Sequence, residues 1–293
     1  MSATIADRPL TAAAPGPKRR RKPLRSRAYK VFRAVALILI VLVFIAPLLW
    51  MLLASFKTNV DIYDASKAVF FTPTWDNYDN VLGRNNYLIF VFNSFWVAFC
   101  STALSLVLGV PAAYAMSRFT MHRSALVVLM ARIIPGVSLL VPWYYVFSNM
   151  HLVGGYSVLI LSHMFVALPL IVYIMMSFFD SMPLELEESA QVDGLTPIGA
   201  FNRITLPLSV GGIATAGILS FIFSWNNFMF ALVLSGAHTK TLPVAIFNFV
   251  SYASIDWGGL MAAAVVVTIP IMVIALFTQK YIVTGLTAGA TKG

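Results

Sequence analysis

Long apolar segments without charged side chains alternate with shorter polar segments along most of this chain. A helix needs about 20 apolar residues to cross the hydrocarbon core of a bilayer, where it also satisfies its own backbone hydrogen bonds. Six segments meet this requirement, at approximately residues 34–56, 88–116, 125–148, 157–179, 209–235 and 258–280. The pattern therefore predicts an all-α, polytopic membrane bundle with six transmembrane helices.

Glycine and proline residues refine two of these assignments. A Gly-Gly pair at residues 154–155 interrupts the long uncharged stretch of residues 133–179, and this predicts a tight loop between the third and fourth helices. The Pro-Gly pair at 135–136 and Pro142 fall within the third predicted helix. Because proline disrupts a helix interior, we expect this membrane segment to be broken.

The composition excludes a soluble globular protein. Hydrophobic residues make up 59% of the chain and charged residues 11%, whereas soluble domains have about 45–50% and about 25%. Too few polar side chains remain to cover a surface that faces water. The single cysteine, Cys100, excludes an internal disulfide and a metal cluster held by several cysteines.

Basic residues are concentrated at the start of the chain. Ten of the 20 Lys and Arg residues and one of the 11 Asp and Glu residues lie within residues 1–33, so this segment carries the whole formal net charge of +9. Basic residues that flank a first hydrophobic helix hold that end in the cytoplasm, and six helices return the C-terminus to the same side. We expect residues 1–30 to form a disordered cytoplasmic tail near anionic membrane lipid. We expect no nucleic-acid partner.

The segment 180–208 is polar enough to lie outside the membrane. Pro183 and three glutamates within residues 185–188 favour a helix start, because proline suits the first turn and carboxylates interact well with the positive end of the helix dipole. Gly194 is expected to end that helix. We therefore predict a helix–turn–helix knob on the cytoplasmic side, placed to transmit a push from a soluble partner into the fourth and fifth membrane helices.

The knob also resembles the EAA loop of ABC importer permeases. It has the motif residues of that loop at the same spacing, namely Glu188-Ser189-Ala190, Asp193-Gly194 and, after nine further residues, Ile204, Leu206 and Pro207. Ser189 replaces the usual alanine, which is an exchange of one small residue for another. Four other stretches resemble the second permease of maltose-type carbohydrate importers, namely Phe92–Ser94, Ala112–Arg118, Trp225–Phe228 and Gly285–Gly293. Asn227 stands where many of those relatives carry an acidic residue.

This resemblance, which covers roughly residues 31–293, implies a type I ABC importer permease domain in a bacterial cytoplasmic (inner) membrane. The implied partners are a second homologous permease, a dimer of ATP-hydrolysing subunits that use ATP and Mg, and an extracytoplasmic solute-binding protein. The implied substrate is a carbohydrate, with another small polar solute as the alternative. The residues implied to couple to the ATPase are Glu187, Glu188, Ser189, Ala190, Asp193, Gly194, Ile204, Leu206 and Pro207. Glu188 would meet a basic residue of that partner.

The chain itself is not expected to be an enzyme or to bind a cofactor. It contains no Gly-Lys pair, which the phosphate-binding loop of an ATPase requires. Its four histidines lack the spacing of a metal site. His163, at the start of the fourth predicted helix, is expected to hydrogen-bond to a neighbouring helix. An ion-coupled secondary transporter is less favoured, because no Asp or Glu lies within any apolar segment.

Polar and aromatic groups within the membrane segments are the candidates for a substrate path, since such groups are costly there and often functional. The candidates are Asn93, Ser94, Arg132, Trp143, Tyr144, Asn226 and Asn227. Each has a structural alternative: Arg132 can extend to the membrane interface, the Trp-Tyr pair can belong to the interfacial aromatic belt, and the amides and Ser94 can hydrogen-bond between helices.

Overall fold

A computed structural model describes residues 27–84, 87–131, 133–250 and 255–288. It divides into two compact units, residues 1–48 and 49–293. The described part of the first unit belongs to helix α1 (Arg27–Ala54), which contains the first predicted membrane segment and Pro47. Most of the basic tail, residues 1–26, lies outside the described residues.

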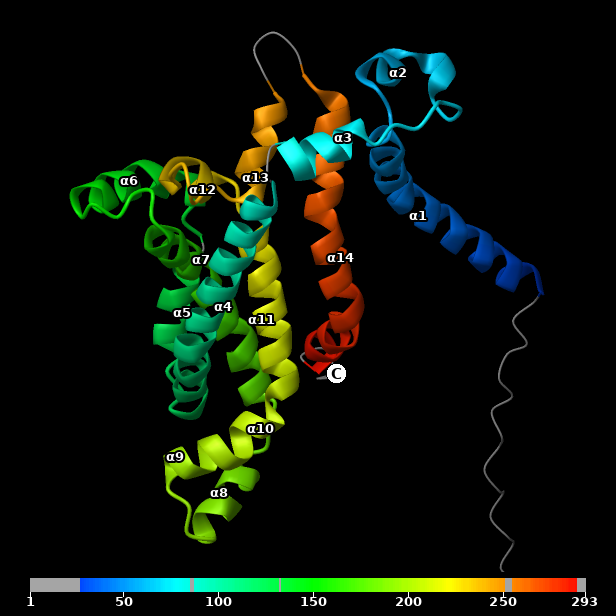
Figure 1. Cartoon of the computed structure of the whole chain (residues 1–293). Coiled ribbons are helices and arrows are strands. Elements are labelled where there is room, and N and C mark those ends of the chain that lie inside the picture. The colour runs from blue at the N-terminus through cyan, green and yellow to red at the C-terminus, as the bar shows by residue number, and fades with distance from the viewer. Residues whose placement is uncertain (1–26, 85–86, 132, 251–254, 289–293) are drawn as a thin grey trace, which may run out of the picture. The chain divides into compact units, whose positions relative to one another are not determined.

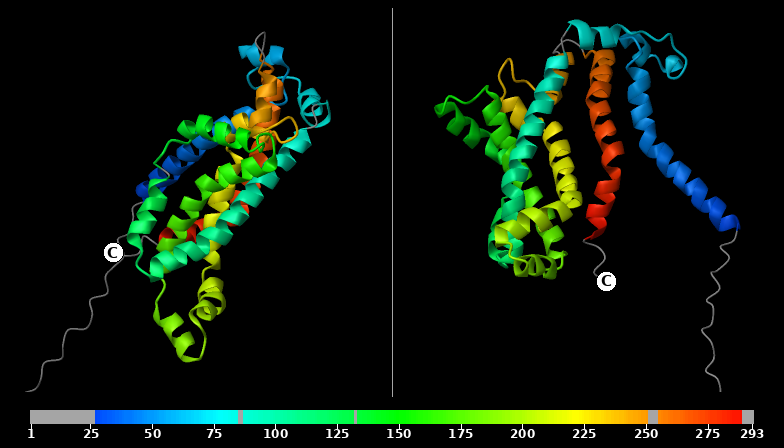
Figure 2. Two further views of the ribbon diagram at one scale, coloured as in Figure 1. Left: turned by 90° about the vertical axis from the view of Figure 1, so that its left-hand side faces the viewer. Right: turned by 60° about the horizontal axis from the view of Figure 1, so that its bottom comes forward.

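Three long helices form the centre of the second unit: α4 (Tyr87–Arg118), α7 (Tyr156–Asp180) and α11 (Val210–Trp225). They pack against one another, and α14 (Trp257–Ala288) packs against α11 (Figures 1 and 2). The long apolar sequence of each segment explains why it is helical. The bounds of α4 and α7 agree closely with the predicted segments 88–116 and 157–179.

Buried polar side chains connect the three central helices. The Oγ atom of Ser224 in α11 lies 2.6 Å from Nδ1 of His163 in α7 and 3.1 Å from Oγ of Ser101 in α4. Hydrogen bonds between membrane helices satisfy polar groups that would otherwise face hydrocarbon. The predicted hydrogen bond from His163 to a neighbouring helix is therefore confirmed.

Short helices lie at the end of the bundle where α4 and α14 begin (Figure 1). They are α2 (Asn59–Tyr63), α3 (Asp76–Asp79), α12 (Met229–Leu234) and α13 (Leu242–Ala245), with the single turns η1 (Ala65–Lys67), η2 (Asn80–Arg84) and η5 (Ile246–Phe249). The buried ammonium group of Lys57 donates hydrogen bonds of 2.9 and 2.7 Å to the carbonyl groups of Lys67 and Ala68. The segment after α1 is thereby folded back on itself.

Within the described residues, four helices are long and apolar enough to cross a membrane. A fifth is obtained if Pro197–Leu208 and Val210–Trp225, which meet at 71°, are taken as one bent pair. These helices are compatible with six crossings, and the full count stays a prediction.

The third predicted membrane segment, 125–148, is broken as its Pro-Gly pair predicts. It consists of α5 (His122–Met130), the turn η3 (Gly136–Leu139) and α6 (Leu140–Asn149). Pro142 lies in the first turn of α6, directly after the break, where a proline is tolerated.

The fifth predicted membrane segment, 209–235, consists of two helices, because α11 ends at Trp225 and α12 begins at Met229. The side-chain oxygen of Asn227 accepts a 3.2 Å hydrogen bond from the backbone N–H of Phe230. Asparagine competes with helical hydrogen bonding through its own side chain, and here it starts a new helix instead of continuing the old one.

Candidate functional site

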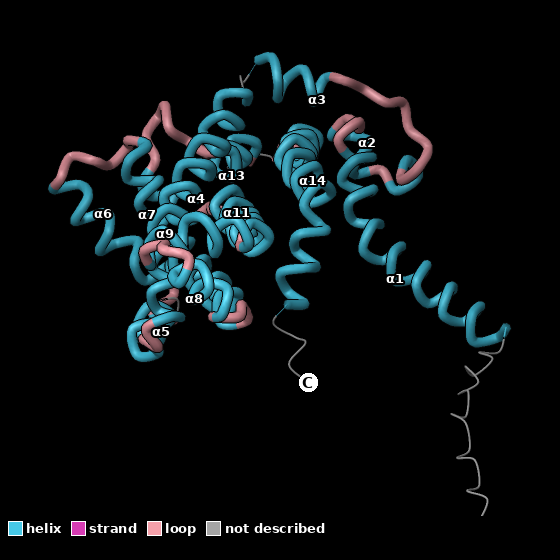
Figure 3. The backbone as a smooth tube through the Cα atoms, turned by 90° about the horizontal axis from the view of Figure 1, so that it is seen from below, coloured by secondary structure: helices cyan, strands magenta, loops and turns pink. Residues whose placement is uncertain are grey.

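The segment between α7 and α11, residues 181–209, forms the predicted helix–turn–helix knob. It contains α8 (Glu185–Val192), α9 (Pro197–Ala200), the wide turn η4 (Phe201–Thr205) and α10 (Leu206–Leu208). Gly194 has a φ of +94°, a conformation that favours glycine, and it ends α8 as predicted. Figure 1 shows the knob projecting from the end of the bundle, and Figure 3 views it from that side.

The carboxylate of Glu187 is buried between α8 and the end of α4. Its Oε1 accepts hydrogen bonds of 2.9 and 2.7 Å from Nε and Nη2 of Arg118, and its Oε2 accepts one of 2.6 Å from the hydroxyl group of Tyr114. Burial acts to raise the pKa of Glu187, but the donors Arg118 and Tyr114 outweigh it and hold this pKa below its ordinary value. Glu187 is therefore an ionised group with its partners inside the chain.

Aromatic packing surrounds this ion pair. The ring of Tyr114 lies 4.5 Å from that of Phe201 in η4 and 5.6 Å from that of Phe179 in α7, measured between centroids. Ala190 of α8 and Ala200 of α9 are also buried. One side of the knob is thus covered by the C-terminal ends of α4 and α7.

The other side of the knob is exposed and carries most of the predicted coupling residues. Glu188, Ser189, Asp193, Gly194 and Pro207 are exposed, whereas Ile204 and Leu206 are half-buried. Two apolar side chains, one on each side of the Gly194 turn, are also exposed: Val192 is 87% exposed and Ile198 is 73% exposed. The structure therefore separates the adjacent glutamates, with Glu187 directed inward and Glu188 outward.

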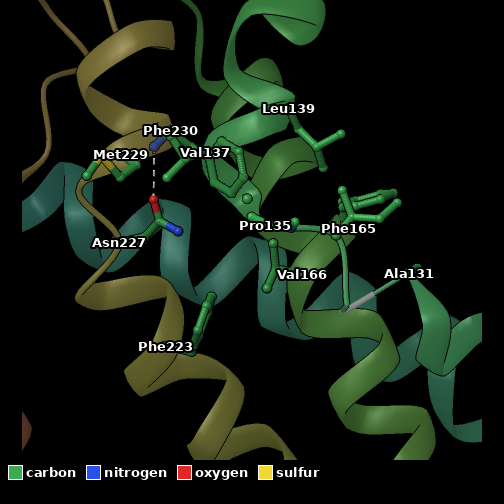
Figure 4. A pocket seen from close by; sticks show the side chains of 12 residues that line it. Ala131, Pro135, Val137, Leu139, Phe165, Val166, Phe223, Asn227, Met229 and Phe230 are labelled. Atoms are coloured by element: carbon green, nitrogen blue, oxygen red, sulfur yellow. Dashed lines mark hydrogen bonds between the residues drawn. The ribbon is translucent and has the colours of Figure 1, made fainter.

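Asn226 and Asn227 lie at the break between α11 and α12, beside two cavities. The first has a volume of about 360 Å³ and is lined by Asn227, Phe230, Phe165 and residues of the η3 turn (Figure 4). The second, of about 610 Å³, is lined by both asparagines together with apolar residues of α7, α11 and α12. A polar amide at the edge of an apolar cavity is a typical arrangement for orienting a small ligand.

Trp143 and Tyr144 of α6 have different surroundings. The ring of Trp143 packs against Phe165 at 4.9 Å and Phe230 at 5.1 Å, and both of these phenylalanines line the smaller cavity. The side chain of Tyr144 is exposed. Arg132, the remaining candidate near this break, lies outside the described residues.

Asn93 and Ser94 are buried near the start of α4 and bind neighbouring segments. Ser94 Oγ accepts a 2.8 Å hydrogen bond from the backbone N–H of Leu242. The Asn93 amide donates bonds of 3.0 and 2.8 Å to the carbonyl groups of His238 and Lys240. These contacts stabilise the fold, so a role for either residue in contacting substrate stays a prediction.

Sequence reasoning did not connect Glu187 with Arg118 and Tyr114. The available signal was a tyrosine and an arginine four residues apart at the predicted cytoplasmic end of α4, which places both on one helix face. Their partner is 69 residues from Arg118 in sequence, and the sequence pattern does not specify that pairing.

Comparison with known proteins places these features in a family. Residues 105–287 match the family described as binding-protein-dependent transport system inner membrane component. The chain is 35% identical over 277 residues to the sulfoquinovosyl glycerol transport system permease protein SmoH of Agrobacterium fabrum, an alignment that covers 93% of this chain and 94% of that one. It is 36% identical over 253 residues to the trehalose transport system permease protein SugB of Mycobacterium tuberculosis, covering 84% and 92%.

A solved structure shares the fold. It is the crystal structure of a bacterial ABC transporter involved in the import of the acidic polysaccharide alginate, matched with a TM-score of 0.74 at 20% identity, over 89% of this chain and 99% of that one. The chain belongs to the family of binding-protein-dependent transport system inner membrane components. It is an integral membrane transport permease.

Proposed function

We propose that this chain is a permease subunit of an ATP-driven importer that carries a carbohydrate across the bacterial inner membrane. The observation that carries the proposal is the similarity, along nearly the whole chain, to permeases named for transport of sulfoquinovosyl glycerol and trehalose. The substrate is a mono- or oligosaccharide or a polyol that passes through chemically unchanged. Import of another small polar solute is the alternative.

The exposed side of the knob is the proposed docking surface for the ATPase partner. Val192 and Ile198 offer apolar area on either side of a tight turn, and Glu188 offers a negative charge beside them. A central apolar contact with charged residues around it is a common form of protein interface. ATP and Mg belong to that partner in this proposal.

The remaining proposed partners are a second homologous permease and an extracytoplasmic solute-binding protein. The family description supports the binding protein, since it names binding-protein-dependent transport. In this arrangement the knob and both termini face the cytoplasm, and α2, α3 and α13 face the binding protein. ATP-driven movement of the knob biases the bundle between two conformations, one open to each side.

The cavities beside Asn227 are the proposed part of the sugar path in this chain. An amide supplies both a donor and an acceptor for sugar hydroxyl groups. Phe165 and Phe230 line the smaller cavity together with Asn227, and Trp143 packs against both of these rings. Asn226 borders the larger cavity. We assign Arg132 to the same path only as a sequence-based proposal.

Uptake by a deletion strain tests the function. Cells that lack this chain, with its partner subunits intact, are supplied with radiolabelled trehalose, maltose, a glycerol glycoside or an amino acid, with and without the wild-type gene. Restored uptake of a glycan that stops when cellular ATP is depleted supports the proposal. Restored uptake of the amino acid alone favours the alternative, and glycan uptake that survives ATP depletion and follows an ion gradient contradicts ATP-driven import.

A further inference from the structure

We propose that Arg118, Glu187 and Tyr114 form a clamp that makes α8 of the knob move together with the end of α4 during transport. This inference rests on the proposed function, because it assumes that a partner displaces the knob. It assigns a positioning role to Glu187, which the resemblance places in the surface that meets the ATPase.

The covalent chain connects the knob only to α7 and α11. Helix α4 is distant in sequence, so force on the knob reaches α4 directly only through non-covalent contacts. The strongest of these join Glu187 to Arg118 and Tyr114, at 2.6 to 2.9 Å. Hydrogen bonds between ionised groups are stronger than neutral ones, and two parallel contacts from one guanidinium also fix orientation.

Arg118 connects three helices at once. Two of its nitrogens bind Glu187 of α8, and Nη1 donates a 3.0 Å hydrogen bond to the carbonyl group of Phe179 in α7. A lysine ammonium has no planar fork and does not reproduce this geometry. The guanidinium therefore holds α4, α7 and α8 in one arrangement.

Burial makes the clamp costly to open. The side chains of Arg118 and Glu187 are only 13% and 3% exposed. Separating a buried ion pair leaves at least one charge without a partner in a poorly solvated place, which is strongly unfavourable. The clamp is therefore expected to stay closed while the bundle changes conformation, so that α4 is carried with the knob.

Distance measurements between spin labels test whether α8 and α4 move together. In a Cys100→Ser background, labels are attached to Leu186→Cys in α8, outside the proposed docking surface, and Phe119→Cys just beyond α4, which are 43% and 73% exposed. The complete transporter, purified through a tag on this chain, is measured in lipid nanodiscs without nucleotide and with ATP and vanadate. An unchanged, narrow distance supports the clamp, and a distance that shifts between these states overturns it.

Substitutions at Glu187 and Arg118 then test whether these residues form the clamp. In Glu187→Gln the distance distribution is expected to broaden, and sugar uptake per ATP hydrolysed is expected to fall about five-fold or more, the range of a typical coupling free energy. The exchange Arg118→Glu with Glu187→Arg is expected to recover part of that ratio. The control Glu185→Gln, an exposed residue of the same helix, is expected to change neither quantity.

The uptake measurement distinguishes a failure of the proposed transport function from a failure of the clamp proposal. If the wild-type complex shows no ATP-dependent sugar uptake, the proposed function fails irrespective of the distances. If uptake is ATP-dependent while Glu187→Gln, folded and assembled, keeps both a narrow distance and a normal ratio of uptake to ATP hydrolysis, the clamp is wrong and the permease assignment stands.

Discussion

The hydroxyl group of Tyr156 donates a 2.6 Å hydrogen bond to the side-chain oxygen of Asn93, joining the first turn of α7 to α4. The amide nitrogen of Asn93 meanwhile binds the carbonyl groups of His238 and Lys240. One fully buried side chain thus holds two helices and the loop after α12 together. This relationship makes Asn93 a structural anchor on the side opposite the knob.

Asn93→Leu is expected to destabilise the chain by about 1–3 kcal/mol, the usual cost of leaving buried polar groups without partners. Thermal unfolding in detergent measures the change. Asn226→Leu is the matched control, because the exposed Asn226 side-chain amide donates its hydrogen bond to the carbonyl group of Ile222 in the preceding helix α11 and not to a distant segment that the structure describes. Equal effects of the two substitutions would contradict the anchoring role, and a sugar-affinity change at Asn93 without destabilisation would favour the substrate path.

Gly236→Ala is expected to destabilise the chain, because a Cβ atom there would lie 2.9 Å from both the Cα and the carbonyl oxygen of Gly154. Relief of such a contact requires movement of backbone, and overpacking typically costs about 1–3 kcal/mol. In Gly211→Ala, by contrast, the added Cβ has no neighbour within 4 Å, and alanine favours the helix α11 more than glycine does, so the stability of this variant should be unchanged or higher. Thermal unfolding of the two variants, measured in parallel with wild type, tests this difference in stability.

The stability contributed by Glu187 should depend on pH. Because its folded-state pKa lies below the ordinary value, the contribution is fully present above the ordinary carboxyl pKa and is lost as the pH falls through the folded-state pKa. The difference in Tm between wild type and Glu187→Gln is therefore expected to be largest near neutral pH and to shrink in acid. A difference in Tm that grows as the pH falls would show that folding raises the pKa of Glu187 instead of lowering it.

Val192→Asp should weaken association with the ATPase partner, because it places a charge at the centre of the proposed apolar docking surface. A loss of about ten-fold in affinity corresponds to the effect of one important interface residue. Co-purification and light-scattering titration measure it. Val60→Asp is the control, because Val60 is exposed in α2 and is distant in sequence from the knob. This substitution should leave ATPase binding intact.

Asn227→Asp keeps an oxygen that can accept the Phe230 N–H bond but removes the amide donor beside the cavities. Its melting temperature is expected to stay near that of wild type, while the KM for sugar uptake rises about ten-fold, equivalent to roughly 1.4 kcal/mol. Asn227→Leu loses the cap as well and should cost about 1 kcal/mol of stability. An unchanged KM in Asn227→Asp would remove this residue from the sugar path.

Apolar length and local turn chemistry were sufficient to predict much of this fold. The expected segments 88–116 and 157–179 correspond to α4 and α7, because an uninterrupted apolar sequence in a membrane has few alternatives to a helix. Gly194 ends α8 as its position after an acidic helix start predicts.

Features that depend on contacts between distant segments were not predictable in this way. The break after Trp225 falls within a long apolar stretch, and only the hydrogen bond from Phe230 to Asn227 shows that a new helix begins there. Similarly, the residue pattern does not show that Glu187 binds Arg118 while its neighbour Glu188 is exposed. Rotation by one helical position, about 100°, decides which side each occupies.

That rotation divides α8 into two surfaces that can evolve separately. In the proposed importer, residues beside Glu188 can be replaced by those of another permease to change which ATPase is recognised, while the inward side around Glu187 keeps its native sequence. Chimaeras made by such grafting would exchange the energy-supplying subunit of a transporter and leave its helix bundle and solute preference as they were.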